Sequence, residues 1–151
     1  MNKYFVLLIF LITACGYQPL YKSNKEVNSF KIQKVEFSGN REIGKKIYAS
    51  LPFILLKDDK SLNNINIYSN KSVIEASKNS KGQVTSYRTT LTINFEIINN
   101  NGELVDKKII KKDFSYNTDE NKFKFKEYQN KIEENLIEDI VEDIIFYINY
   151  S

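Results

Sequence analysis

The segment from Tyr87 to Ile97 alternates apolar and polar side chains, and this pattern restricts the fold more than any other feature of the chain. Successive side chains of a β-strand point to opposite faces, so residues two apart share a face. The segment therefore predicts a half-buried strand, in a sheet that other elements cover on one side. Its apolar face contains Tyr87, Leu91, Ile93, Phe95 and Ile97, and its polar face contains Arg88, Thr90, Thr92, Asn94 and Glu96.

Turn sequences stand on both sides of this strand. Ser80-Lys81-Gly82 precedes it as a polar turn. Asn99 to Gly102 follows it and predicts a hairpin, because Asn and Gly tolerate the positive φ of a tight turn. The partner strand is expected from Leu104 to Tyr116. It contains Lys107, Lys108, Lys111 and Lys112. Lysines in such a strand are typical of a sheet edge, where they discourage pairing with other sheets.

Two segments have the period of an amphipathic helix. Ile43, Ile47 and Leu51 recur every four residues, with Asn40 as the expected N-cap and Pro52 as the expected end. A longer helix is expected from about Glu120 to Tyr147. Its apolar stripe contains Ile132, Leu136, Ile137, Ile140, Val141, Ile144, Ile145 and Ile148. Its opposite face contains Glu133, Glu134, Glu138, Asp139, Glu142 and Asp143, which we interpret as a solvated face.

The remaining strand signals are shorter. Residues 30–37 predict one strand whose alternation slips after Ile32, and residues 63–69 predict another. Residues 73–77 are a weaker candidate, and the apolar run 53–56 is expected to pack under a loop. The order strand, helix, strands, helix predicts an α+β fold. In this two-layer sandwich, two α-helices pack on one face of a mixed, mostly antiparallel β-sheet.

The N-terminus resembles a bacterial lipoprotein signal. An apolar run from Tyr4 to Ile12 is too short to cross a bilayer, and it is followed by Thr13-Ala14-Cys15-Gly16 in the order of a lipobox. We expect a signal peptide at residues 1–14, lipidation of Cys15, a tether at residues 15–28 and a single domain at residues 29–151. Acyl chains on the sulfur and the new amino terminus would hold the protein on a membrane. The alternative is an ordinary signal peptide with a free cysteine.

Composition excludes several kinds of chemistry. The chain has no histidine and one cysteine, so a histidine base, a Cys/His zinc site and an internal disulfide are all impossible. The net charge of +3 is too small to indicate nucleic acid. The acidic face of the last helix and Asp58-Asp59 are poor metal signals, because nothing else in their surroundings suggests a ligand set. We therefore expect no enzyme activity, no catalytic residue, no cofactor and no metal.

Two groups of lysines are the remaining candidates for binding. Lys78 and Lys81 flank the Gly82 turn, and Lys122, Lys124 and Lys126 open the last helix, interleaved with Phe123 and Phe125. Ammonium groups beside apolar rings suit an amphiphile that has phosphates on its head and acyl tails. The alternative is an ordinary cluster of solvated lysines.

The order of these parts resembles the lipopolysaccharide-assembly lipoprotein family, LptE. The matching residues are Cys15-Gly16-Tyr17, the strand and helix from Phe30 to Leu51, Lys81-Gly82-Gln83 leading through Tyr87 into the long strand, and Phe114 to Asn117 before the last helix. The resemblance implies an outer-membrane lipoprotein of a Gram-negative bacterium, facing the periplasm.

The same resemblance implies partners and a site. The domain would plug the β-barrel that inserts lipopolysaccharide and assist its assembly, in a complex of LptD type. Lys81 falls at the hairpin tip, and Lys122 or Lys124 at the second position, that the family associates with lipopolysaccharide. The family's tip often has arginine where this chain has Lys81. The competing hypothesis is a stand-alone lipoprotein that binds a small ligand in an apolar pocket between sheet and helices.

Overall fold

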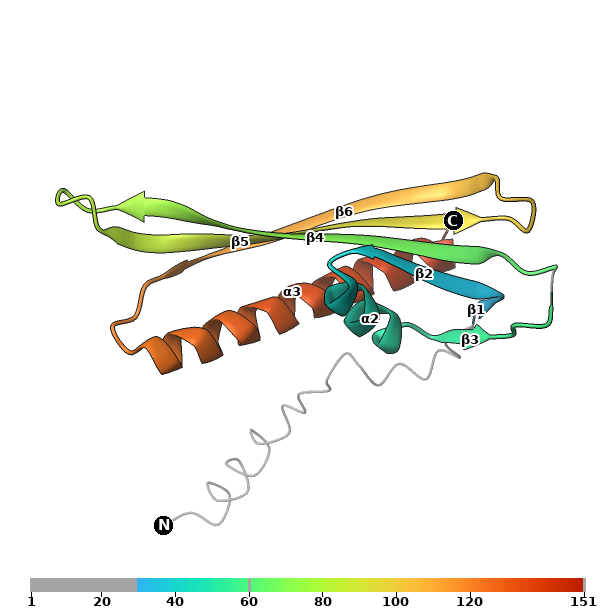
Figure 1. The fold of residues 1–151 in the computed structure, drawn as a ribbon, viewed down its shortest axis with the longest axis horizontal. Coiled ribbons are helices and arrows are strands. Elements are labelled where there is room, and N and C mark those ends of the chain that lie inside the picture. Colours follow the sequence, from blue (N-terminus) through green and yellow to red (C-terminus); the bar gives the residue numbers. More distant parts are fainter. Residues whose placement is uncertain (1–29, 60, 151) are drawn as a thin grey trace, which may run out of the picture.

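The computed structural model describes residues 30–59 and 61–150 (Figure 1). The expected signal peptide, Cys15 and the tether lie outside the described residues. Along the chain the elements are β1 (Phe30–Ile32), β2 (Lys34–Gly39), α2 (Arg41–Ser50), β3 (Phe53–Leu55), β4 (Asn64–Lys78), β5 (Val84–Ile98), β6 (Leu104–Asn117) and α3 (Lys122–Tyr150). None of the described helices is both long enough and apolar enough to span a membrane.

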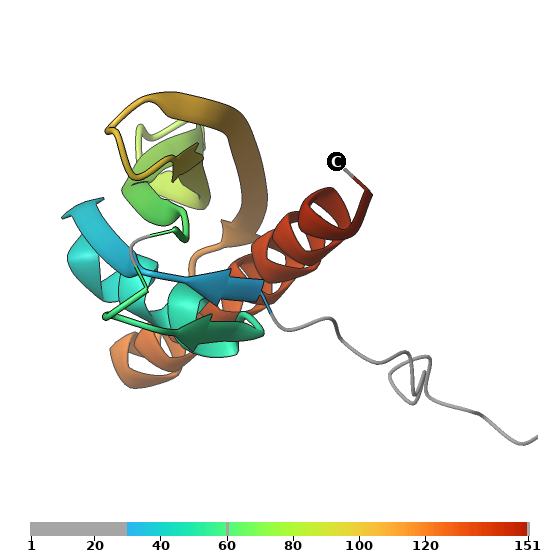
Figure 2. The ribbon, with the colours of Figure 1, turned by 90° about the vertical axis from the view of Figure 1, so that its right-hand side faces the viewer.

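The main sheet has four strands in the order β2-β4-β5-β6. β4, β5 and β6 form two antiparallel pairs, and β2 joins β4 in parallel, opposite Asn64 to Ser69. Both helices lie on the same side of this sheet (Figures 1 and 2). The predicted α+β fold, with a mixed and mostly antiparallel sheet and two helices on one face, is confirmed.

The core lies between the sheet and the helices. The alternation of β5 has the predicted phase, since Leu91, Ile93 and Phe95 are fully buried beneath the helices. The stripe of α3 is buried from Ile132 to Ile144. Fully buried side chains from α2, β4 and α3 complete this layer: Ile43, Ile47, Ile67, Ile140 and Ile144.

Helix α2 begins and ends where the local sequence predicts. The Asn40 side chain accepts a hydrogen bond from the Ile43 N–H at 3.3 Å, which satisfies one of the amides that a first turn leaves unpaired. Leu51, with φ −89° and ψ 145°, has left the helical region, as is expected of a residue that precedes proline.

Three expectations about the strands are wrong. Residues 30–37 form two strands and not one, because the chain changes sheet at Gln33: β1 pairs in parallel with β3 and β2 pairs with β4. This change of sheet explains the slip in alternation. Residues 53–55 are a strand in register with β1 and are not simply packed under a loop. The two short strands expected between residues 63 and 77 are one strand, β4.

The two hairpins of the sheet extend to opposite ends of the molecule (Figure 1). Their tips have the same internal geometry. The Asn79 side chain accepts hydrogen bonds from the N–H groups of Lys81 and Gln83, each at 3.0 Å. Asn99 does the same for Asn101 and Glu103, each at 2.9 Å. An asparagine that binds the backbone ahead of it therefore fixes each tip.

Candidate functional site

The tip of the β4–β5 hairpin presents Lys81 to solvent. The bond from the Lys81 N–H to Asn79 fixes the backbone of the tip, so the ammonium group projects from an ordered turn. Lys78, at the base of the turn, forms an ion pair of 2.8 Å with Glu75, and this carboxylate raises the pKa of Lys78. Lys81 has no such partner among the ion pairs of the described residues.

The start of α3 presents the second group of lysines. The Asn121 side chain accepts from the N–H groups of Phe123 and Lys124, each at 3.1 Å, and so caps the first turn. Lys122, Lys124 and Lys126 are exposed there. The two phenylalanines between them separate, because successive helical residues point about 100° apart. Phe123 is 79% exposed, whereas Phe125 packs against the core.

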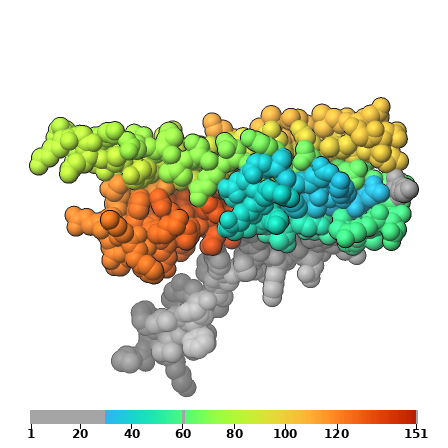
Figure 3. Space-filling model, viewed as in Figure 1, coloured from blue at the N-terminus to red at the C-terminus, as the bar shows by residue number. Residues whose placement is uncertain are grey.

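The hairpin tip and the start of α3 lie at the same end of the molecule (Figures 1 and 3). The structure thus places all three predicted site residues, Lys81, Lys122 and Lys124, on one end. In the described ranges, no hydrogen bond or ion pair joins Lys81 to either of the others. Ammonium groups that do not contact each other are able to bind separate anionic groups of one large ligand.

A cluster of aromatic rings connects α3 to the sheet at this end. The Phe125 ring centroid lies 5.8 Å from that of Tyr87 and 5.9 Å from that of Tyr116. The Tyr116 hydroxyl is 3.1 Å from the Thr89 hydroxyl and accepts from the Gln129 side chain at 3.1 Å. Aromatic contacts of this kind contribute about 0.5–1.5 kcal/mol each beyond their buried area. The cluster therefore fixes the direction in which the first turns of α3 project their lysines.

Exposed apolar side chains also occur in the parts of β4, β6 and α3 that lie toward this end. They are Val73, Ile74, Phe114, Phe123 and Tyr128. Of these, sequence reasoning identified only Phe123 as part of the site. Val73 and Ile74 belong to the second half of β4, which the sequence predicted weakly. Two consecutive apolar residues within a strand, one on each face of the sheet, are the sequence signal that indicates Val73 and Ile74.

Glu133 of α3 corrects one expectation about the acidic face. Its side chain is only 15% exposed, and its carboxylate lies 2.5 Å from the Lys71 ammonium and 3.0 Å from that of Lys46. Burial raises the pKa of Glu133, but the hydrogen bonds from the two lysines outweigh burial and hold the pKa below its usual 4.5. Glu133 thus joins α2, β4 and α3. Glu134, Glu138, Asp139 and Glu142 are exposed, as expected.

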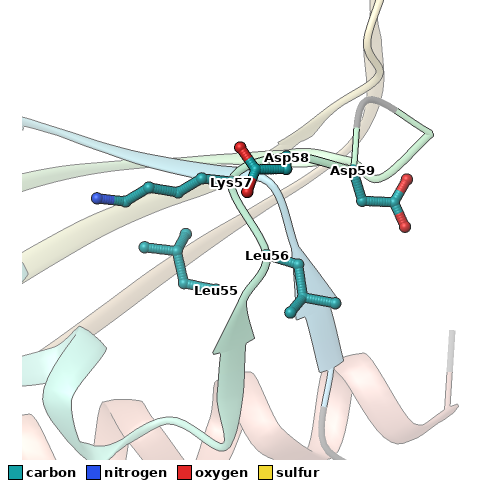
Figure 4. Close-up of a pocket in the computed structure, with 5 residues that line it drawn as sticks. All are labelled: Leu55, Leu56, Lys57, Asp58 and Asp59. Atoms are coloured by element: carbon teal, nitrogen blue, oxygen red, sulfur yellow. The ribbon is translucent and has the colours of Figure 1, made fainter.

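The described residues do not form a metal site. No three acidic or other ligating side chains converge within residues 30–59 and 61–150. Asp59 accepts two hydrogen bonds from Ser61, in a turn as predicted, and these lower the pKa of Asp59. Figure 4 shows that Asp58 and Asp59 point in different directions. The hollow beside them, about 680 Å³, is lined by Leu55 to Asp59 alone.

Fold and surface together define the class of protein. The chain is a two-layer α+β domain with two helices on one face of its sheet, and one end of it combines lysines with exposed apolar side chains. Comparison with protein families gives a match to the family "LptE: Lipopolysaccharide-assembly" over residues 28–148. The chain belongs to this family, which confirms the resemblance found in the sequence. Membership implies a lipoprotein role in lipopolysaccharide assembly.

Solved structures of lipoproteins have a similar fold. The rare lipoprotein B of Shewanella oneidensis has a TM-score of 0.59 and 13% identity, over 77% of this chain and 93% of that one. A minor lipoprotein of Acinetobacter baumannii has a TM-score of 0.56 and 14% identity, over 78% of this chain and 91% of that one. The uncharacterized lipoprotein B of Nitrosomonas europaea has a TM-score of 0.55 and 11% identity, over 79% of this chain and 83% of that one. These likenesses show the fold alone. No curated protein matches the chain in sequence.

Proposed function

We propose that this protein is a lipid-anchored outer-membrane lipoprotein that plugs the β-barrel which inserts lipopolysaccharide, and assists its assembly. The family match over residues 28–148 is the observation that supports this most strongly. The lipobox that ends at Cys15 supports it independently, because it accounts for the only cysteine of the chain. The partner is a large outer-membrane β-barrel of LptD type, and the protein faces the periplasm.

The proposed division of the chain follows from these two observations. Residues 1–14 are removed as a signal peptide, Cys15 is lipidated, residues 15–28 form the tether and residues 29–151 form the single domain. Fifteen residue steps separate Cys15 from Phe30. A fully extended chain of this length spans at most roughly 50 Å. The domain is thereby held next to the membrane surface, where an outer-membrane barrel opens to the periplasm.

The proposed ligand contact is the end of the domain that contains Lys81, Lys122 and Lys124. Lipid A combines phosphates with acyl chains, and this end combines ammonium groups with the exposed rings of Phe123 and Tyr128. The ammonium groups bind phosphate, and the rings provide apolar contact. We infer that the activity is binding and not catalysis, because the family is one of lipopolysaccharide assembly.

Co-purification from detergent-solubilised membranes tests the plug. The tagged full-length chain should bring down one large β-barrel protein in a stoichiometric amount. A Cys15→Ser variant separates anchoring from binding, because it removes the acylated sulfur and leaves the domain unchanged. Wild-type protein that is acylated and folded, yet brings down no barrel, would contradict the proposal.

The stand-alone carrier is less well supported. It needs an enclosed apolar pocket between sheet and helices, but that layer is filled by side chains such as Ile47, Phe95 and Ile140, each 0% exposed. The hollow between α2, β4 and α3, about 360 Å³, is lined mainly by charged residues such as Lys71 and Glu133. Titration with small apolar ligands should therefore give no saturable binding to the domain.

A further inference from the structure

The outer strand of the sheet has an open edge. Among residues 30–59 and 61–150, β6 is the last strand in the order β2-β4-β5-β6 and pairs only with β5 over its fourteen residues. An edge of this length has a row of backbone groups to which another strand is able to bind. Three large aliphatic side chains of β6 are more than half exposed: Leu104, Val105 and Ile109.

The register of β6 identifies the outward-directed backbone groups. In an antiparallel ladder, alternate residues direct both N–H and C=O to the neighbouring strand, and the residues between them direct both away. The Thr118 N–H donates to the Thr85 carbonyl at 3.0 Å. Every second residue of β6, counted back from Thr118, therefore directs its backbone N–H and C=O toward β5, and Ile110 and Lys108 are among them. The residues between them, which include Ile109, Lys111 and Asp113, direct these groups to the open side.

Side-chain contacts agree with this assignment. Lys107 is also on the open side, and its N–H donates to the Asp106 carboxylate at 2.7 Å, which a ladder position would not allow. Within the described ranges, no other bond outside the ladders involves the N–H of Ile109, Lys111 or Asp113. The open edge thus begins beyond Lys107, and Ile109, Lys111 and Asp113 supply its donors and acceptors.

The end of α3 forms an apolar groove beside the same edge. Phe146 and Tyr150 are 66% and 68% exposed, and their ring centroids are 4.6 Å apart. With Lys108, Asp143 and Tyr147 they line a groove of about 330 Å³. The Lys108 ammonium lies 5.5 Å from the centre of the Tyr147 ring, so β6 forms one wall of this groove. Side chains on the helix-facing side of an added strand would enter it.

The charges of β6 indicate which kind of strand is able to bind at its open edge. β6 contains four lysines, Lys107, Lys108, Lys111 and Lys112, against two acidic residues, Asp106 and Asp113. Lys107 is paired with Glu96 of β5 at 2.8 Å and Lys112 with Asp143 of α3 at 2.7 Å, so Lys108 and Lys111 are the lysines of β6 outside the ion pairs of the described residues. Two copies of β6 paired with each other would bring these lysines together, and like charges on paired strands are destabilising. An acidic strand would be attracted. The lysines that discourage self-association therefore favour a heterologous partner.

We propose that the β6 edge binds an extended segment of a partner protein in which acidic residues alternate with aromatic or aliphatic ones. The backbone of the segment pairs with Ile109, Lys111 and Asp113. Its acidic side chains lie beside Lys111 on the outer face of the sheet, and its apolar side chains enter the groove of Phe146 and Tyr150. Strand addition of this kind gives affinity through the main chain and specificity through alternate side chains. The proposal does not depend on the plug.

Peptide binding to the full-length chain in detergent micelles tests this inference. The probe is a nine-residue peptide that alternates glutamate with phenylalanine or valine, and its control replaces every glutamate with lysine. The acidic peptide should shift the amide resonances of Ile109 and Lys111 and slow their hydrogen exchange at least tenfold at saturation. The basic peptide should bind at least tenfold more weakly.

Variants at Lys111 separate the backbone contribution from the charge. Lys111→Pro removes an outward N–H without breaking the β5–β6 ladder, as edge strands tolerate, and should weaken binding at least tenfold. Lys111→Ala keeps that N–H and should lose less affinity for the acidic peptide than Lys111→Pro does. Lys111→Glu should also weaken binding of the acidic peptide at least tenfold, and this test remains available if the proline variant does not fold. Lys45→Glu on α2 is the control and should not change the binding.

Four results would overturn the inference. They are equal affinity for the two peptides, unchanged binding to a folded Lys111→Pro variant, resonance shifts centred on the Lys81 turn instead of β6, and a dimer of the chain itself through β6.

Discussion

The carboxylate of Glu133 lies 2.5 Å from the ammonium of Lys71, and this contact ties the last helix to the middle of the sheet. Lys46 of α2 reaches the same carboxylate at 3.0 Å, so one acidic side chain holds three elements together. The pair is partly shielded from water, since the side chains of Glu133 and Lys71 are 15% and 29% exposed. It therefore differs from the solvated pairs of the surface, which contribute little.

Replacing Glu133 with glutamine should destabilise the domain, because Lys71 would keep its charge and lose its partner. Hydrogen bonds to charged groups contribute about 1.5–3 kcal/mol each, so a loss of about 2 kcal/mol in the free energy of unfolding is expected. Urea unfolding at pH 7 measures this loss. Glu134→Gln, at the exposed neighbouring position, is the control and should change stability by less than about 0.5 kcal/mol. Equal effects of the two variants would show that the triad contributes nothing.

The same contact predicts a pH dependence. The pKa of Glu133 is lower in the folded protein than its usual 4.5, so the folded state favours the ionised carboxylate. Its contribution is therefore fully present above about pH 5 and is lost as the pH falls through the folded pKa. The stability difference between wild type and Glu133→Gln should shrink as the pH is lowered from about 5 into more acidic solution. A difference that stays constant over this range would contradict the assignment of the effect to Glu133.

Replacement by alanine should lower the free energy of unfolding by different amounts at Gly39 and at Gly82. Both have positive φ, 68° and 78°. An alanine Cβ at Gly82 meets nothing within 4 Å, but at Gly39 it would lie 2.2 Å from the Ser69 carbonyl oxygen. Gly82→Ala should therefore cost only the conformational penalty of about 1–2 kcal/mol. Gly39→Ala should cost clearly more, because β2 and β4 would have to separate. Thermal unfolding of the two variants measures the difference, and equal melting temperatures would refute it.

Local signals in the sequence predicted much of this fold. The alternation around Leu91, the capping side chain of Asn40 and the Asn-Gly turn at residue 102 each act within a few residues, and each element was found where expected. The pairing of β1 with β3 was not predicted, because it joins Phe30 to Phe53 across a helix and no local pattern encodes such a register. Regular spacing on α3 likewise gave no sign that Glu133, and not Glu134, meets a lysine of β4.

The sequence identifies the candidate lysines but not their shared position, for the same reason. Lys81 and the lysines of α3 were identified from their positions beside a turn and beside phenylalanines. That they share one end of the molecule follows from the length of β4 and β5 and from the packing of Phe125 on Tyr87 and Tyr116.

Reversing the charge of the site should weaken lipopolysaccharide binding without unfolding the domain. In the variant Lys81→Glu, Lys122→Glu, Lys124→Glu, three repulsive groups face the lipid phosphates, and a loss of affinity of at least tenfold is expected, about 1.4 kcal/mol. Titration of the full-length chain with lipopolysaccharide in detergent measures the loss. The control is Lys31→Glu, Lys45→Glu, Lys57→Glu, which changes the net charge equally at exposed positions away from this end. If both variants lose affinity alike, the attraction is a property of the net charge and not of the site.

Arginine at the hairpin tip should bind more tightly than the lysine that is present. A guanidinium group is able to hold two phosphate oxygens at once, whereas an ammonium group acts as a point charge. The Asn79 side chain orders the tip through backbone N–H groups, so Lys81→Arg leaves that geometry intact. We expect Lys81→Arg to raise the affinity for lipopolysaccharide several-fold and Lys81→Gln to lower it. The same titration with lipopolysaccharide that lacks its lipid A phosphates should remove the advantage of arginine. An advantage that persists without phosphate would mean that Lys81 contacts another part of the ligand.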